Sequence, residues 1–197
     1  MTKIPKLVQE YIDIVENGVF RTCKEQKLLV DLVKKVFNEE TLVYDEEKID
    51  RYMSFQKYFP FELFEWEKFC FILHNCVFDL NGEPRWPDLF TLVGRGAGKN
   101  GYLSFEDFCL ITDTHSIYQY DIDICANSEE QARTSFDEII NVLENPKWTK
   151  KLKKFFRWTK TEIENLATRS KIKYRTNNPK GKDGLRSGKV DFDEPHA

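Results

Sequence analysis

The chain is organised around residues 89–100, which read Leu89-Phe90-Thr91-Leu92-Val93-Gly94-Arg95-Gly96-Ala97-Gly98-Lys99-Asn100. The apolar run 89–93 is short and contains β-formers, which predicts a buried strand of a parallel sheet. Apolar residues at helical spacing follow the glycines, so we expect a helix from Lys99 to about Thr112. A strand, a glycine-rich turn, a lysine and a helix in this order are typical of a phosphate-binding loop.

The chemistry of such a loop explains its composition. Glycines let backbone N–H groups turn inward and approach phosphate oxygens closely. The helix N-terminus adds partial positive charge, and Lys99 can reach the β- and γ-phosphates. The match to G-x-x-x-x-G-K-[ST] is imperfect, because Val93 replaces the first glycine and Asn100 replaces the Mg²⁺-binding hydroxyl residue. A plain strand–helix connection therefore stays open as an alternative for this stretch alone.

A second motif lies at the end of the sequence, in Lys189-Val190-Asp191-Phe192-Asp193-Glu194. An extended segment that runs into Asp-Glu downstream of a phosphate-binding loop is typical of a Walker B strand. In that interpretation Asp193 holds Mg²⁺ and Glu194 orients or deprotonates the attacking water. The alternative is a solvated acidic pair. Asp191 inside the strand departs from the apolar pattern and could mark an edge.

These motifs together resemble the N-terminal ATPase domain of the large terminase subunit of tailed phages. The resemblance extends from about residue 60 to the end. It is supported by further stretches before the loop, after it and ahead of Asp193-Glu194: Phe61-Glu62-Leu63-Phe64-Glu65-Trp66, Ala126-Asn127-Ser128-Glu129-Glu130-Gln131-Ala132 and Lys173-Tyr174-Arg175-Thr176 leading through Asp183-Gly184.

The resemblance implies an α/β fold of the P-loop NTPase (ASCE) type, in which helices flank a parallel sheet. It implies a helical lead-in over 1–58 and an ATPase core over 59–197. The implied activity is ATP hydrolysis with Mg²⁺ that drives double-stranded DNA into a procapsid. The implied partners are the DNA, the portal protein, the small terminase subunit and further copies of the subunit in a ring, in the host cytoplasm.

The resemblance also assigns roles to individual residues. Residues 94–100 would bind the nucleotide, and Arg95 could stabilise charge on the γ-phosphate or be a solvated turn residue. Asn100 and Asp193 would be the metal ligands. Trp66 and Glu67 stand where the family has an aromatic-Gln pair that contacts adenine. Ionised glutamate cannot donate a hydrogen bond to the base, and Trp66 could equally be a core aromatic residue.

Terminases of this family continue beyond these motifs with further strands and a nuclease domain, whereas this sequence ends three residues after Glu194. We therefore expect the 197-residue chain to have little ATPase activity alone. The alternatives are another P-loop enzyme, such as a helicase-like ATPase or a small-molecule kinase, and a nucleotide-binding fragment without turnover.

Composition limits the remaining choices. The formal net charge is −3, so a DNA-binding surface must be local. Residues 147–160 are such a local cationic segment with aromatic residues between the charges, although an amphipathic helix end with a solvated face is the alternative. The five cysteines form no C-x-x-C motif and predict reduced thiols. No segment reaches membrane-spanning length, so we expect a soluble cytoplasmic protein.

Other patterns predict the surrounding elements. Helices are expected over 5–17, from a capping box at residues 22–25 through Phe37, after Asp45, over about 62–76, and from Ser128 to Asn145. The apolar stripe of the second helix is predicted to comprise Leu28, Leu29, Leu32, Val33, Val36 and Phe37. Strands are expected over 120–126 and 171–176. The alternation of strands and helices predicts a parallel sheet with right-handed crossovers.

Overall fold

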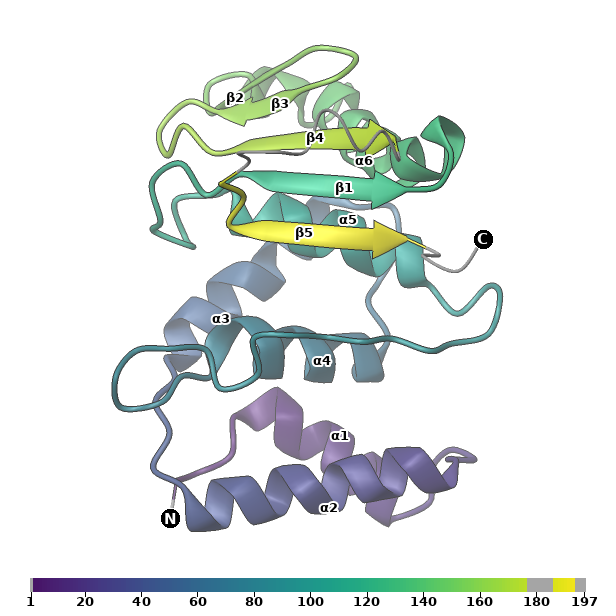
Figure 1. Cartoon of the computed structure of the whole chain (residues 1–197), viewed down its shortest axis with the longest axis vertical. Helices are drawn as coiled ribbons and strands as arrows, with labels where there is room; N and C mark the ends of the chain where they lie inside the picture. Colours follow the sequence, from purple (N-terminus) through teal and green to yellow (C-terminus); the bar gives the residue numbers. More distant parts are fainter. Residues whose placement is uncertain (1, 177–185, 194–197) are drawn as a thin grey trace. The chain divides into compact units, whose positions relative to one another are not determined.

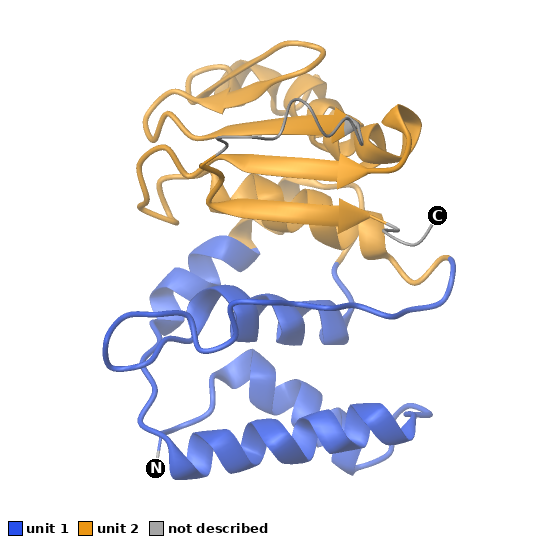
Figure 2. Cartoon of the chain, in the orientation of Figure 1, with its two compact units in different colours: residues 1–53, 63–95 blue, residues 54–62, 96–197 orange. Residues whose placement is uncertain are grey.

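The computed structural model describes residues 2–176 and 186–193. The chain forms two compact units, one of residues 1–53 and 63–95 and the other of residues 54–62 and 96–197 (Figure 2). Each unit is described by itself below. The predicted division of the chain at residue 58 stays a prediction.

The first unit is helical. Its helices are α1 (Lys6–Glu16), α2 (Lys24–Glu39), α3 (Glu46–Met53) and α4 (Glu65–Cys76). Aromatic residues join α4 to its neighbours, because the rings of Tyr11 and Phe69 lie 4.6 Å apart and those of Tyr52 and Phe71 lie 5.3 Å apart. Asp45 caps α3 as predicted, since its Oδ1 accepts a hydrogen bond of 2.9 Å from the Glu47 amide.

Two details of α2 differ from the prediction. Its N-cap is Cys23, whose backbone N–H donates to Gln26 Oε1 at 2.9 Å, so the cap lies one residue later than expected. Its buried face is Val30, Val33, Val36 and Phe37, whereas Leu28, Leu29 and Leu32 are exposed. The sequence offers two overlapping apolar stripes, and spacing alone does not say which one packs.

The predicted strand over 89–93 is wrong. Among the described residues, no strand pairing includes this segment, and it adopts no regular secondary structure. Phe90 is 86% exposed and Leu92 is 88% exposed. An apolar run becomes a strand only where neighbouring strands satisfy its backbone N–H and C=O groups, and no described strand pairs with this run.

The second unit contains a five-stranded sheet in the order β2-β3-β4-β1-β5. The strands are β1 (Ile122–Ala126), β2 (Phe156–Trp158), β3 (Ile163–Asn165), β4 (Lys171–Thr176) and β5 (Lys189–Asp193). β1 pairs in parallel with β4 on one side and β5 on the other, and β2 and β3 extend the sheet antiparallel. The α/β fold with a parallel core is therefore confirmed, and β2 and β3 are additions that periodicity did not predict.

Two helices, α5 (Lys99–Leu110) and α6 (Glu129–Glu144), lie over the same face of this sheet (Figure 1). β1 presents Ile122 and Ile124 to this face, and the Phe136 ring of α6 lies 5.2 Å from the Tyr174 ring of β4. The Gln131 amide donates to Ser128 Oγ at 3.2 Å, which confirms the predicted cap of α6. The second unit also contains the short helices η1 (Ser54–Tyr58) and α7 (Thr149–Leu152).

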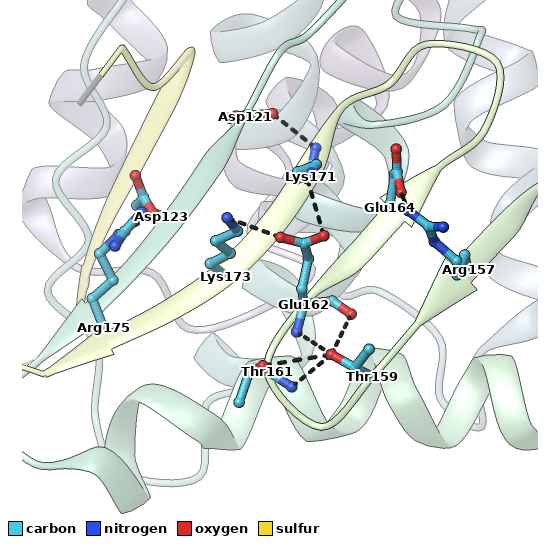
Figure 3. Close-up of polar contacts among 10 residues, drawn as sticks. All are labelled: Asp121, Asp123, Arg157, Thr159, Thr161, Glu162, Glu164, Lys171, Lys173 and Arg175. Atoms are coloured by element: carbon cyan, nitrogen blue, oxygen red, sulfur yellow. Dashed lines mark hydrogen bonds and ion pairs between the residues drawn. The ribbon is translucent and has the colours of Figure 1, made fainter. Parts of the chain in front are cut away.

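The opposite face of the sheet is polar, as Figure 3 shows. Lys171 and Lys173 of β4 both reach Glu162, at 3.1 and 2.8 Å, and Arg175 pairs with Asp123 of β1. Because successive side chains of a strand point to opposite faces, Lys171, Lys173 and Arg175 of β4 lie in one row on the same face. In β1 and β4 the strand alternation thus separates an apolar helix-covered face from an ion-paired one, whereas β5 turns charged residues toward α5.

Candidate active site

The glycine-rich turn has the backbone that its sequence predicts. Gly96 and Gly98 have positive φ angles of 82° and 93°, in the left-handed region that favours glycine. Gly98 is the N-cap of α5, and the Tyr102 amide donates to its carbonyl at 3.0 Å. The turn therefore delivers the chain directly into a helix N-terminus, where free amides and the helix dipole favour an anion.

Lys99 and Asp193 lie together, although 94 residues separate them in the sequence. Lys99 is the first residue of α5 and Asp193 is the last residue of β5, and their side chains form an ion pair. Asp193 is only 8% exposed. The structure thus brings together two of the predicted site residues, the lysine that follows the glycines and the carboxylate at the end of β5.

Asn100 has an unsatisfied oxygen. Its Oδ1 is buried and has no hydrogen-bond partner among the described residues. A buried amide oxygen without a partner is costly, and amide and carboxylate oxygens are suitable ligands for Mg²⁺. Asn100 Oδ1 and the Asp193 carboxylate therefore fit a divalent cation by the chemistry of their donors.

The structure does not test whether the other predicted site residues approach Lys99 and Asp193. Arg95 is exposed and belongs, with Gly94, to the first unit, as do Trp66 and Glu67. Glu194 lies outside the described residues. Their approach to Lys99 and Asp193 stays a prediction.

Glu67 is a buried carboxyl group, only 2% exposed. Its Oε2 accepts a hydrogen bond of 2.7 Å from the Phe64 amide, and its Oε1 has no partner among the described residues. Burial raises the pKa of Glu67 to about 7 against the hydrogen bond from Phe64, which lowers it. Near neutral pH this group is partly protonated, and a protonated carboxyl group can both donate and accept a hydrogen bond, as a glutamine side chain does.

We expect Glu67→Gln to stabilise the protein at pH 8 by about 1–3 kcal/mol and to have little effect near pH 4.5. The folded protein binds the Glu67 proton more tightly than the unfolded chain, so the wild-type free energy of unfolding falls as pH rises from about 4.5 to about 7. Glutamine removes that pH dependence and can still accept the hydrogen bond from the Phe64 amide. Urea unfolding at pH 4.5 and pH 8 measures the free energy of unfolding of both proteins.

The matched control is Glu25→Gln, which changes an exposed glutamate in the first turn of α2. This control should leave the pH dependence of unfolding as in the wild type. A parallel fall in stability with pH in Glu67→Gln and wild type would contradict the assignment.

A buried ion cluster, not predicted from the sequence, joins α5 to β5. Lys189 Nζ lies 2.8 Å from Glu106 Oε2, 2.6 Å from Asp107 Oδ1 and 2.8 Å from Asp191 Oδ1. Burial and the neighbouring Asp191 raise the pKa of Asp107 well above its ordinary value. Burial alone would lower the pKa of Lys189, but the carboxylates around it raise that pKa well above its ordinary value. The sequence signal is the alternation of Lys189, Asp191 and Asp193 on one side of β5.

The comparisons with known proteins bear on the fold. No protein-family model matches the sequence, and no curated protein matches it. The crystal structure of the HK97 bacteriophage large terminase has a similar fold, with a TM-score of 0.58 and 15% identity. The match covers 76% of this chain and 31% of the terminase chain, so this chain corresponds to less than a third of that protein. This chain therefore has a fold similar to that of part of a phage large terminase.

Proposed function

We propose that this chain binds ATP with Mg²⁺ and is the ATP-hydrolysing part of a DNA-packaging terminase. The observation that carries the proposal is the contact of Lys99, at the end of the glycine-rich turn, with Asp193, at the end of a parallel strand. Ligands of open α/β sheets bind outside the carboxyl ends of the strands. The similarity in fold to a phage large terminase supports the same proposal.

The turn residues 94–100 bind the phosphates in this proposal. The α5 N-terminus and the backbone amides of the turn face the negative charge, and Lys99 exchanges its bond to Asp193 for bonds to phosphate oxygens. The family resemblance assigns Trp66 and Glu67 to the base, and this assignment is part of the proposal; a protonated Glu67 can supply both a donor and an acceptor.

Asn100 Oδ1 and Asp193 hold the divalent cation, which neutralises charge on the phosphate oxygens when it is bound. Release of Lys99 leaves the Asp193 carboxylate available to the cation. Glu194 accepts a proton from the attacking water or orients it, and Arg95 stabilises the charge that develops on the γ-phosphate.

Titration of the wild-type chain with ATP, with and without Mg²⁺, tests the nucleotide proposal. We expect binding that Mg²⁺ strengthens. No binding in either condition would refute the proposal. A helicase-like ATPase is the alternative function, and hydrolysis stimulated by single-stranded but not double-stranded DNA would favour it.

Double-stranded DNA is the proposed macromolecular partner, and the cationic segment 147–160 is the surface that suits it. The segment contains no acidic residue. Its cations are all exposed: Lys147, Lys150, Lys151, Lys153, Lys154, Arg157 and Lys160. Arg157 pairs with Glu164 at 2.5 Å, and Lys147 Nζ lies 4.6 Å from the Trp148 ring centroid. Among the residues that the structure describes, the lysines of this segment have no carboxylate partner, and their charge suits a phosphate backbone.

We expect replacement of Lys150, Lys151 and Lys154 by glutamine to weaken binding to a random-sequence 30-base-pair duplex by about 10-fold or more. It should also reduce the slope of log affinity against log salt by about 2–3, because each lost phosphate contact removes about 0.9. Fluorescence anisotropy over a salt series measures both quantities.

The matched control replaces Lys24, Lys27 and Lys35, three exposed lysines of α2, by glutamine. This control makes the same change in net charge. Equal loss of affinity in the two variants would show that net charge alone governs binding, and the segment would lose its assignment.

A further inference from the structure

The Lys189 ammonium group is the cation of a buried carboxylate cage. Its side chain is 9% exposed, and those of Glu106, Asp107 and Asp191 are 2%, 0% and 8% exposed. Ligand oxygens of the three carboxyl groups lie within 4.8 Å of one another, a spacing that could also hold a metal ion. Lys189 Nζ contacts all three groups at 2.6–2.8 Å, so a tethered ammonium group already occupies the centre.

The cage and the Lys99–Asp193 pair connect the same two elements. Glu106 and Asp107 follow Lys99 by about two turns of α5, which is a rise of about 11 Å. Lys189 precedes Asp193 by four residues of β5, which is a rise of about 13 Å. Because the two distances are nearly equal, α5 and β5 are joined at two matched points, one at the candidate site and one inside the unit.

Apolar packing does not fix β5 against α5. The β5 residues that face this helix are Lys189, Asp191 and Asp193, whereas Val190 and Phe192 point the other way and are exposed. Apolar contacts are non-directional and tolerate sliding, but charge-assisted hydrogen bonds fix distance and direction. Backbone pairing with β1 fixes β5 within the sheet, and the ionic contacts of β5 fix this strand against α5, so both set the position of Asp193 along the α5 axis.

We propose that Lys189 is a positioning residue that holds β5 in register with α5 and so sets the Asp193 carboxylate beside Lys99 and Asn100. This inference rests on the proposed function, because the register matters for a cation that Asp193 and Asn100 share. Glu106, Asp107 and Asp191 are the groups through which Lys189 acts, and Tyr102 OH fixes Glu106 with a hydrogen bond of 2.9 Å.

The test uses Lys189→Met, which keeps an unbranched side chain as far as Cε and removes the ammonium group. In the wild type, Mg²⁺ should raise the affinity for ATP. We expect the ratio of the affinities with and without Mg²⁺ to be at least 10-fold smaller in the variant. The affinity for ATP without Mg²⁺ should stay within about 2-fold, since Lys99 and the turn are unchanged. Calorimetric titration with and without Mg²⁺ separates the two effects.

A second variant guards against simple unfolding, because removal of one partner from a buried ion pair is strongly destabilising. Lys189→Met combined with Asp107→Asn has the same formal charge in the cage as the wild type but lacks the ammonium bonds. It should fold, lose the Mg²⁺ gain as the single variant does, and show at least 10-fold faster amide hydrogen exchange in 190–193 than the wild type. Exchange in α6 should be unchanged.

The outcomes separate the two proposals. Unchanged hydrogen exchange in β5 and an unchanged Mg²⁺ gain in the double variant would overturn the positioning role, whatever the wild type binds. An equal loss of ATP affinity with and without Mg²⁺ would mean that Lys189 has a purely structural role, and it would also overturn the positioning role. A wild-type chain that binds no ATP would instead refute the proposed function, and the positioning role with it.

Discussion

Lys99→Ala is expected to lower the affinity for ATP by at least about 100-fold, which corresponds to about 2.7 kcal/mol. In the proposed complex the Lys99 ammonium group bonds to phosphate oxygens, and hydrogen bonds between charged groups contribute about 1.5–3 kcal/mol each. The backbone of the turn is preserved, because its conformation depends on Gly96 and Gly98 rather than on the lysine side chain.

The measurement is calorimetric titration of ATP into the folded variant, with the far-ultraviolet circular dichroism spectrum as a check of the fold. Asp193 loses its ion-pair partner in this variant, so a modest loss of stability, on the order of 1 kcal/mol, is expected. Lys173→Ala is the matched control, since Lys173 is also a partly exposed lysine that pairs with a carboxylate, Glu162, at 2.8 Å. Unchanged ATP affinity in Lys99→Ala would remove the basis for the phosphate-binding assignment.

Glu194→Gln should lower the rate of ATP hydrolysis by at least about 100-fold and leave ATP affinity within about 2-fold. Glutamine preserves the size of the side chain and its capacity to accept a hydrogen bond, but it cannot take a proton from water. General-base catalysis by a positioned carboxylate typically contributes about 10²–10⁴-fold.

Phosphate release at saturating ATP, measured on the intact gene product, tests this expectation. Glu130→Gln, which changes an exposed glutamate in the first turn of α6, serves as the control and should hydrolyse ATP at the wild-type rate. Wild-type turnover in Glu194→Gln would mean that another group activates the water.

Local signals in the sequence predicted the elements that hold the candidate site. The helix from Lys99, the capped helix from Ser128 and the strands at 120–126, 171–176 and 189–193 all form close to the expected bounds. Caps, glycine positions and short-range periodicity determine these elements, and each is encoded within a few residues. The predicted phosphate-binding loop and Walker B strand place Lys99 and Asp193 in one site, and the two residues form an ion pair in the structure.

The failures concern pairing between strands, which periodicity does not report. The run 89–93 has a strand composition, but its backbone finds no pairing partner among the described residues. Residues 147–160 contain the four-residue helix α7 and then β2, whose Phe156 pairs with Asn165 of β3. β2 and β3 have three residues each, too few for an alternating pattern to identify them.

Asp191 shows how a departure from pattern can carry information. Its charge within a strand argues against an apolar Walker B strand when the sequence is taken alone. In the structure it is buried beside Lys189, and β5 is one of the two edge strands of the described sheet. The helix residues that make this burial possible, Glu106 and Asp107, lie more than 80 positions earlier.

The shared ammonium group of Lys189 also constrains how this sequence can diverge. Because a single cation serves Glu106, Asp107 and Asp191, the effect of replacing one of these residues depends on the identity of the other three, and their mutational free energies are not additive. Natural variation should therefore change the four positions together, with an apolar set as one accessible replacement. Single substitutions at these four positions should therefore be rarer among related sequences than single substitutions at the exposed leucines of α2.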